Sequence, residues 1–309
     1  MKNVNEIDYE KLIVDKEDEF VQYNDLLHKY WTKDTKLNCI SATTLIHRYV
    51  QPFDSEFWSR YKALEAIVDK SIFTDIKKKL VDTKKFDYKY LGECGIDEES
   101  FENKRQEILK EWEKKNKDAC ERGTALHKFH ELQALGGNVE SIQRLKLGGT
   151  FETRTDNKIV PGKGVYPELL LSRISDDGKL RIAGQADLII VDGLDVYILD
   201  FKTNKALDKK SYFDRKQKRS VKMQYPLNNL DDCNYMHYSM QLSLYAWMIQ
   251  KINPNFNIKA LTLIHLDHDG GTSFHDCEYL KVDVERMLVH YKKQIEHEEF
   301  KKSMEKIVF

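Results

Sequence analysis

Cysteine is scarce and scattered in this sequence. Its five cysteines form no Cys-x-x-Cys pair and stand far apart, at Cys39, Cys94, Cys120, Cys233 and Cys277. This spacing argues against a disulfide framework, a zinc ribbon and a cysteine-ligated cluster. It favours a reducing compartment, in which free thiols persist.

Long apolar runs are absent as well, because no run approaches the roughly 20 residues that a helix needs to cross a bilayer. The first residues, Met1 to Asp8, lack a secretory core, and their acids argue against an organelle transit peptide. The chain is rich in lysine and asparagine, which suits a phage or a bacterium. We therefore expect a soluble protein in the cytoplasm of a bacterial or phage-infected cell, without membrane contact.

An excess of charge of one sign is also missing. The 50 Lys and Arg residues nearly balance the 51 Asp and Glu residues, which leaves a net charge of -1. A near-neutral total neither predicts nor forbids a nucleic-acid partner, since only local clusters of charge do so. A chain of 309 residues can bury a full core, in one large domain or two modest ones.

Residues 101–309 carry the alternating pattern of an α/β core. The expected elements are a helix over 101–135, strands over 166–175, 180–191 and 195–203, a helix over 238–252, a strand over 258–266 and a helix over 282–298. Short Asp-Gly turns between the first three strands indicate an antiparallel meander. These expected elements predict a central mixed β-sheet flanked by helices.

Residues 1–100 form a mainly helical amino-terminal accessory region in our interpretation. A hairpin is expected around a polar turn at residues 33–36, and Ser41 is placed to cap a helix. Asp54 or Ser55 is placed to cap another helix. Apolar residues such as Trp31 imply that this region packs on the core, because a free tail would not carry them.

Glu168 and Asp187 are expected to face each other on neighbouring strands. If Asp177-Gly178 form the two-residue loop of a type I′ hairpin, the pairing register places these two acids opposite one another. Carboxylates so placed repel each other, since opposed Cβ atoms lie about 4.5–5.5 Å apart. Such a pair indicates a bound cation.

Asp200 and Lys202 extend this row on the third strand. A type II′ turn at Gly193-Leu194 pairs Asp187 with Asp200, whereas a loop at Asp192-Gly193 leaves the two acids diagonal on the same face. Strand alternation places Lys202 on that face too. Three acids in register beside a lysine therefore form a candidate catalytic site.

Hydrolysis of a phosphodiester is the chemistry that suits this row. Hard oxygen ligands favour Mg²⁺ or Mn²⁺, which polarise the phosphoryl group and lower the pKa of a bound water. A nearby lysine can orient or deprotonate that water and offset charge in the transition state. A lone Asp-x-Lys is usually an ordinary part of a solvated strand, whereas the registered acids favour the site.

Two residue pairs on the flanking helices have i, i+4 spacing. Gly123 and His127 lie one turn apart, so the missing side chain lets the face that carries His127 approach the sheet. Gln241 and Tyr245 align an amide and a phenol on a helix that is apolar on nearly every face and hence buried. Taken alone, these pairs are readily explained as a boundary histidine and two core residues.

Five motifs in chain order resemble the PD-(D/E)xK nuclease superfamily. They are Gly123-x-x-x-His127, Glu168, Gly184-x-x-Asp187, Asp200-Phe201-Lys202-Thr203 and Gln241-x-x-x-Tyr245. The resemblance covers about residues 120–250. It is strongest to the RecB-type branch, which includes phage exonucleases and the mitochondrial genome maintenance exonuclease. It implies a restriction-endonuclease-like core in residues 101–309.

The resemblance also implies a set of metal ligands. His127, Asp187 and Asp200 would bind Mg²⁺ or Mn²⁺ through their side chains, and Phe201 would bind it through its backbone carbonyl. Glu168 would be an outer ligand or an acid that positions water.

Other site roles follow from the same resemblance. Lys202 would be the catalytic lysine, and Gln241 and Tyr245 would hold substrate or order the site. Many relatives have arginine and an aliphatic residue where this chain has Gln185-Ala186, so contacts there differ. Only Cys277 follows the Gln-Tyr helix, so no iron–sulfur cluster is expected.

A basic segment follows the lysine. Its cations and aromatic residues are Lys205, Lys209, Lys210, Tyr212, Phe213, Arg215, Lys216, Lys218, Arg219 and Lys222. Cations for phosphates and rings for base stacking suit single-stranded nucleic acid, although a solvated charged loop explains them equally well. Its position beside the site favours substrate contact, so we expect substrate binding by Thr203, Lys205, Lys209, Lys210, Tyr212 and Arg215.

These expectations describe a metal-dependent exonuclease that acts on single-stranded or end-exposed DNA in replication, recombination or repair. An endonuclease of restriction or junction-resolving type is an alternative. A non-hydrolytic subunit of a helicase–nuclease complex is another, although the retained ligands and Lys202 argue against it. The expected partners are DNA, preferably single-stranded, and a helicase or recombination protein.

Overall fold

The computed structural model describes residues 12–214, 218–267 and 269–307, which divide into two compact units. Unit 1 holds the described residues of Met1–Val50, Ala125–Phe213 and Ser220–Phe309. Unit 2 holds those of Gln51–Thr124 and Asp214–Arg219. In the described part of the chain, no helix is long and apolar enough to cross a membrane.

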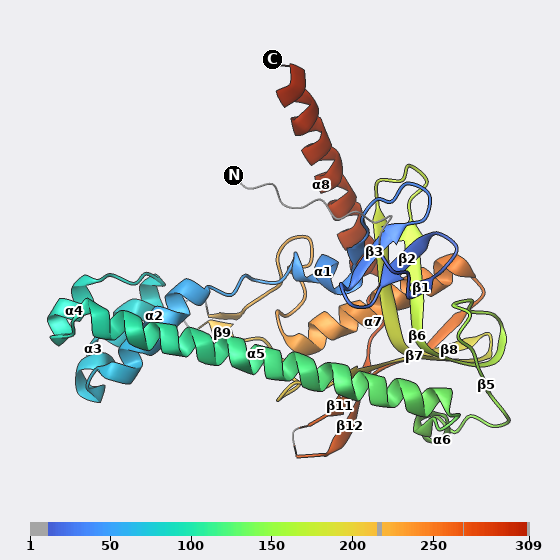
Figure 1. Ribbon diagram of the computed structural model, residues 1–309, viewed down its shortest axis with the longest axis horizontal. Helices are drawn as coiled ribbons and strands as arrows, with labels where there is room; N and C mark the ends of the chain where they lie inside the picture. Colours follow the sequence, from blue (N-terminus) through green and yellow to red (C-terminus); the bar gives the residue numbers. More distant parts are fainter. Residues whose placement is uncertain (1–11, 215–217, 268, 308–309) are drawn as a thin grey trace. The chain divides into compact units, whose positions relative to one another are not determined.

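Unit 1 is built on a seven-stranded mixed sheet with the order β12-β11-β8-β7-β6-β5, to which β4 adds beside β7 (Figure 1). The strands are β4 (Ile40–Ser41), β5 (Glu152–Thr153), β6 (Gly162–Ile174), β7 (Arg181–Gly193), β8 (Asp195–Lys202), β11 (Asn257–Leu266) and β12 (Thr272–Cys277). The predicted meander is formed by β6, β7 and β8, which pair antiparallel. The connection from β8 to the parallel strand β11 passes through α7 (Asn234–Ile252).

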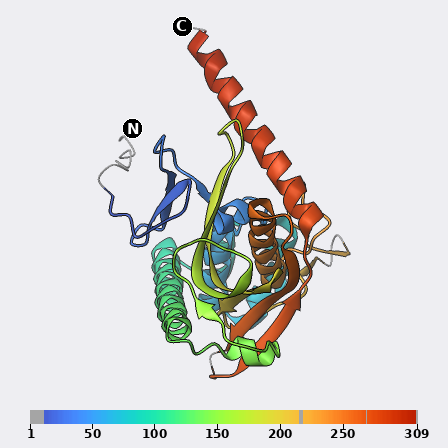
Figure 2. The ribbon, with the colours of Figure 1, turned by 90° about the vertical axis from the view of Figure 1, so that its right-hand side faces the viewer.

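Helices cover both faces of this sheet (Figure 2). On one face, α1 (Ala42–His47), α7 and α8 (Lys281–Ile307) pack against strand residues such as Ile189 and Ile198. On the other face, the end of α5 (Glu98–Leu135) and the neighbourhood of α6 (Glu140–Arg144) cover Leu188 and Leu199. The α/β class with a mixed sheet flanked by helices is thus confirmed, and the arrangement is consistent with a restriction-endonuclease-like core.

Residues 12–50 belong to unit 1. A three-stranded antiparallel sheet is formed by β1 (Lys16–Glu17), β2 (Val21–Asn24) and β3 (Lys29–Thr32). Tyr23 and Tyr30 from this sheet share a core with Leu170 and Ala183 of the large sheet. The predicted boundary between residues 100 and 101 therefore does not separate the units, because strand residues near the amino terminus complete the core of unit 1.

Unit 2 is helical. It contains α2 (Ser55–Ile67), α3 (Lys70–Thr83), α4 (Lys89–Cys94) and the first part of α5. Asp214 of β9 (Phe213–Asp214) and Arg219 of β10 (Arg219–Ser220) are also assigned to it. Its core is aromatic, with Phe57, Tyr61, Phe73 and Phe101 buried together. The helical prediction thus holds for residues 51–100 but not for the strand-rich residues 12–41.

Helix ends follow the predicted capping chemistry. The Ser41 side chain accepts a hydrogen bond from the backbone N–H of Thr44 at the start of α1. At the start of α2, it is Asp54 rather than Ser55 that accepts, from the backbone N–H of Phe57. Each cap satisfies an N–H group that has no partner inside its helix.

The turn between β6 and β7 differs from its prediction. Gly178 donates its N–H to the Ser175 carbonyl and has a φ of +67°, while Asp177 accepts hydrogen bonds from the Ser175 hydroxyl and the Lys179 N–H. Local bonding of this kind stabilises a four-residue loop, residues 176–179, instead of a type I′ loop with two left-handed residues. The predicted and the observed loop have the same centre, so the pairing register of β6 with β7 is the predicted one.

Candidate active site

The sheet opens between β7 and β8 at the predicted carboxylates. Their ladder ends at the pair Leu188 and Leu199, in the register predicted for a loop at Gly193-Leu194. The next pair in that register is Asp187 and Asp200. Instead of continuing the ladder, Asp187 Oδ2 accepts a hydrogen bond of 2.7 Å from the backbone N–H of Phe201. A side-chain oxygen has replaced a strand carbonyl, and the two strands separate.

Gly184 lies on β7 in the gap that this separation leaves. The β4 ladder reaches β7 only at Ile182 and Ala183, so residues 184–187 are paired with neither β4 nor β8 in the described registers. The ring of Tyr245 from α7 lies against Gly184. A Cβ on Gly184 would lie 2.8 Å from Tyr245 Cε1, so only glycine allows this approach.

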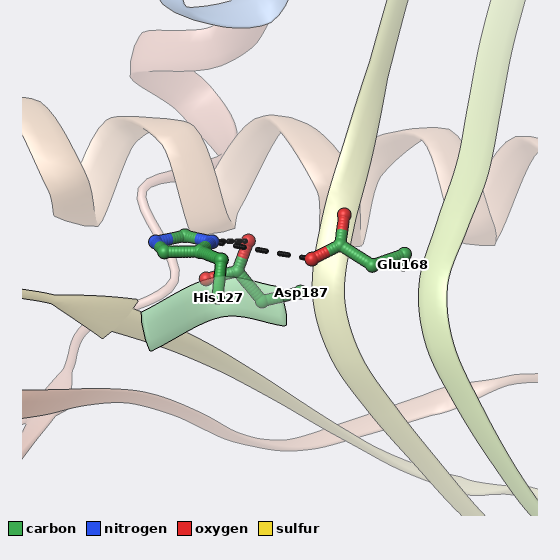
Figure 3. A group of neighbouring side chains, drawn as sticks. All are labelled: His127, Glu168 and Asp187. Atoms are coloured by element: carbon green, nitrogen blue, oxygen red, sulfur yellow. Dashed lines mark ion pairs between the residues drawn. The ribbon is translucent and has the colours of Figure 1, made fainter. Parts of the chain in front are cut away.

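His127, Glu168 and Asp187 converge where the strands separate, and we call them the metal trio. One potential ligand atom from each lies within 4.8 Å of the others. Figure 3 shows the imidazole directed at both carboxylates, with Nδ1 at 3.4 Å from Asp187 Oδ1 and 3.9 Å from Glu168 Oε1. Helix α5, strand β6 and strand β7 thus each supply one side chain.

The backbone of Glu168 is responsible for part of this convergence. Its φ of +47° is in the left-handed region. The β6–β7 ladder includes Pro167 and Leu169, on either side, but not Glu168 itself. Tyr166 and Leu169 pack in the same core cluster, although strict alternation would place them on opposite faces. A non-glycine residue in this conformation costs about 1–3 kcal/mol. Lys16 supports it by donating to the Glu168 carbonyl at 3.1 Å.

Asp200 and Lys202 form a second group next to the trio. Lys202 Nζ lies 2.6 Å from Asp200 Oδ2, and the Asp200 side chain is 1% exposed. Gln241 Nε2 donates to Asp200 Oδ1 at 3.3 Å and to Tyr245 Oη at 3.2 Å. The Lys202 ammonium also lies 4.6 Å from the ring centre of Tyr238. A chain of contacts therefore runs from Gly184 through Tyr245, Gln241 and Asp200 to Lys202.

Electrostatics in the site favour the protonated forms of His127 and Lys202. Burial alone would lower the pKa of His127 and that of Lys202, but neighbouring carboxylates outweigh it. The pKa of His127 rises to about 9, chiefly through Asp187, and that of Lys202 rises through Asp200. Both side chains therefore carry a positive charge at neutral pH.

Burial acts on the carboxyl groups in the opposite sense. It raises the pKa of Glu168 to about 7, with help from the charge of Asp187, and that of Asp200 to about 6. Burial would also raise the pKa of Asp187, but the His127 imidazolium outweighs it and lowers that pKa. Without a divalent cation, the imidazolium is the charge that balances Asp187.

The structure thus brings together most of the predicted site. Glu168, expected as an outer ligand, belongs to the trio, whereas Asp200, expected as a direct ligand, lies outside it and contacts Lys202. The roles of Asp200 and of the Phe201 carbonyl as ligands stay predictions.

Three contributors were missed by sequence reasoning. His130 stacks on the Phe201 ring, with 4.1 Å between ring centres. Its i, i+3 spacing from His127 was the available signal. Tyr238 has the same i, i+3 spacing from Gln241 on α7, whereas Lys16 had no comparable signal.

The basic segment after Lys202 has mixed surroundings. Lys205, Lys209 and Lys210 are exposed, and Tyr212 is 70% exposed. Thr203 is half-buried, and Arg215 lies outside the described residues. Lys209 also lies over the ring of Tyr235, at 5.1 Å from its centre. Contact of this segment with substrate stays a prediction.

Comparison with known proteins adds little to this geometry. No protein-family model matches the chain, and no curated protein matches it. The chain is similar to a solved structure described as "Crystal structure of SSO0001", with 18% sequence identity and a TM-score of 0.26. The match covers 42% of this chain and 50% of that one, so the chain spans about half the length of that protein. A likeness this weak carries no argument about function.

Proposed function

We propose that this protein is a metal-dependent nuclease that hydrolyses phosphodiester bonds of DNA. Its specific form in this proposal is an exonuclease on single-stranded or end-exposed DNA. The observation that carries the proposal is the metal trio, which meets within 4.8 Å beside a lysine ammonium held 2.6 Å from a further buried carboxylate.

The donor set fits a divalent cation. Glu168 and Asp187 offer hard oxygen ligands and His127 offers a nitrogen, which Mn²⁺ accepts more readily than Mg²⁺ does. Asp200 Oδ2 is buried and, among the described residues, receives no well-directed hydrogen bond, although the ammonium lies beside it. A cation bound here would polarise a phosphoryl oxygen and lower the pKa of water.

Lys202 supplies positive charge in this proposal. Its pKa is raised by Asp200, so the ammonium is not a general base in the metal-free site. It is suited to stabilise the negative charge that develops on phosphoryl oxygens in the transition state. The ion pair with Asp200 and the ring of Tyr238 restrict its position.

Gln241, Tyr245 and Gly184 are positioning residues. Gln241 orients Asp200 through the hydrogen bond to Oδ1, and Tyr245 accepts a hydrogen bond from the same amide. Gly184 allows the Tyr245 ring to lie against β7. The alignment of Asp200 with Lys202 therefore depends on packing between α7 and the sheet.

A single assay tests this function. The purified protein is incubated with end-labelled single-stranded and double-stranded DNA, linear and circular, in Mg²⁺, Mn²⁺ or EDTA. We expect degradation of linear single strands with metal, more strongly with Mn²⁺, and none in EDTA. Cleavage of circular DNA would favour the endonuclease alternative, and binding without cleavage would favour the non-hydrolytic subunit.

The cellular setting belongs to the same proposal. Action in DNA replication, recombination or repair, beside a helicase or recombination protein, fits an enzyme that consumes DNA ends. The free thiols of the five cysteines fit a reducing compartment, such as the cytoplasm of a bacterial or phage-infected cell.

A further inference from the structure

A second pocket, of about 350 Å³, lies in unit 1 away from the metal trio. Residues from the β3 hairpin, α1, the turn before β7 and α8 line it. Its polar lining includes Lys29, Ser41, Thr44, Arg48, Lys179 and Arg181. No aspartate or glutamate is among the described residues that line it. We call it the Arg48–Arg181 pocket.

The cations of this pocket are largely without anionic partners. Lys179 pairs with Glu299 at 2.9 Å, but among the described residues Lys29, Arg48 and Arg181 form no ion pair. Arg181 is instead oriented by two backbone carbonyls, to which its guanidinium donates hydrogen bonds. Arg48 lies 5.2 Å from the ring centre of Tyr291. Cations gathered in a concave site raise the local potential and attract an anion.

The chemistry of the lining suits a phosphate group. Guanidinium groups match the geometry of phosphate oxygens, and two arginines are oriented here by other contacts. The Ser41 hydroxyl donates to Thr44 Oγ1 at 2.7 Å, so the Thr44 hydroxyl is the one whose proton can be donated to an anion. The volume is ample for one phosphate group with its sugar.

The strand β7 connects this pocket to the metal trio. Ser41 of the pocket pairs with Ala183, four residues before Asp187 on the same strand. Four strand residues span about 13 Å. A stacked nucleic-acid strand rises about 3.4 Å per nucleotide, so this span corresponds to about four nucleotides.

A larger groove of about 1160 Å³ borders Glu168 on another side, but its charge is unsuitable for DNA. Its lining includes Asp15, Glu17, Asp18 and Glu131, and acidic residues outnumber lysines in it. A phosphate backbone would be repelled there. Of the two pockets, the Arg48–Arg181 pocket is the one with a charge complementary to DNA.

We propose that the Arg48–Arg181 pocket binds a phosphate group of the substrate strand, about four nucleotides from the bond that is cleaved. This inference rests on the proposed nuclease function. It assigns the strand a path along β7, away from the acidic groove. The phosphate is either a terminal group or an internal phosphodiester, and the two sources are distinguished by experiment.

The test measures binding without turnover. Single-stranded oligonucleotides with a 5′-phosphate or a 5′-hydroxyl are titrated in EDTA over a range of salt, and Kd is read from fluorescence anisotropy. The double variant Lys29→Gln/Arg48→Gln should weaken binding about tenfold. Its salt slope should fall by about 0.7, since the pocket neutralises one phosphate of a single strand. Arg48→Lys, which keeps the charge, should retain the slope.

The matched control is Lys77→Gln/Lys78→Gln, which removes the same charge from exposed positions on α3. It should change Kd less than twofold, and thermal melting confirms that each variant is folded. A loss confined to the 5′-phosphorylated strand identifies a terminal phosphate, and an equal loss on both strands identifies an internal one. Either result supports the pocket.

Failure of this inference is distinguishable from failure of the proposed function. If the wild-type protein degrades DNA but the double variant keeps its Kd and salt slope, the pocket is overturned and the nuclease stands. If the protein neither cuts nor binds DNA, pyrophosphate is titrated and followed by phosphorus NMR. Pyrophosphate binding that the double variant loses would support a phosphate pocket in a protein that is not a nuclease. No binding would overturn both proposals.

Discussion

Lys202 is the residue whose proposed role is confined to the transition state. We expect Lys202→Ala to lower kcat by about 10²–10³ while the Kd for single-stranded DNA changes less than threefold. Lys78→Ala, at an exposed position on α3, is the control and should keep its activity. Single-turnover kinetics and anisotropy measure the two quantities. If affinity collapses while turnover survives, Lys202 is only a phosphate anchor.

Glu168 makes the metal-free protein sensitive to pH. Its pKa is raised to about 7 by burial and by Asp187, above an unfolded value of about 4.3. Its contribution to stability is therefore fully present below the unfolded pKa and is lost as pH rises through about 7.

In EDTA, we expect the melting temperature of the wild-type protein to fall more steeply between pH 5 and pH 8 than that of Glu168→Gln. Asp200 and His127 are present in both proteins, so the difference between the two curves reports the Glu168 carboxyl together with its coupling to Asp187. Parallel curves would show that the Glu168 carboxyl titrates normally.

His127 links metal binding to proton release. Its pKa of about 9, set by burial and the stronger opposing effect of Asp187, means that the imidazole is protonated at neutral pH. A nitrogen must lose its proton before it binds a metal ion. Mn²⁺ binding at pH 7.5 should therefore release close to one proton, and affinity should rise toward pH 9. Calorimetry in buffers of different ionisation enthalpy measures this release, and a His127→Asn variant should show only the smaller release from Glu168, whose pKa is about 7.

At the scale of secondary-structure elements, the site depends on the approach of α7 to the gap in β7. In Gly184→Ala, a Cβ would lie 2.8 Å from Tyr245 Cε1 and 3.2 Å from the Ala42 Cβ. We expect a loss of about 1–3 kcal/mol of stability from overpacking and a fall in kcat, because the Tyr245 ring must shift. Chemical denaturation and steady-state kinetics measure both effects.

The matched control is Gly92→Ala in α4, where an added Cβ meets no atom within 4 Å. It should leave activity unchanged and stability equal or higher, since alanine favours a helix over glycine. Tyr245→Leu combined with Gly184→Ala should recover stability but not activity. Full activity in Gly184→Ala would show that the position of Tyr245 does not matter.

For the whole molecule, a bound cation should add to folding stability. A ligand at 100 times its Kd stabilises the folded state by about 2.7 kcal/mol. Mn²⁺ should therefore raise the melting temperature of the wild-type protein, and Asp187→Asn should abolish the increase. The ligands lie in unit 1, so only the transition of that unit should move if the two units unfold separately. An equal increase in Asp187→Asn would place the bound cation elsewhere.

Local sequence patterns were sufficient to predict the strands, the long helix and much of the strand register. Turn residues between close strands define the centre of a hairpin, and the centre alone determines which residues face each other. For this reason Glu168 and Asp187 were placed opposite one another correctly although the type of the first turn was wrong. Nearly continuous apolar residues likewise predicted the buried helix α7, whose residues 239–249 are all buried.

Only the tertiary structure decided how these elements make a site. The β7–β8 ladder ends next to Asp187, whose side chain accepts a hydrogen bond from the Phe201 N–H. Glu168 has a left-handed backbone conformation, and α5 places His127 beside both carboxylates. The compact units also cross the predicted boundary, because strands near the amino terminus share the core of the large sheet. Periodicity and turn chemistry act over a few residues, whereas these contacts join residues far apart in the chain, such as Lys16 and Glu168, which are 152 positions apart. Their free energy depends on the packing of the whole unit, so it leaves no pattern in any short stretch of sequence.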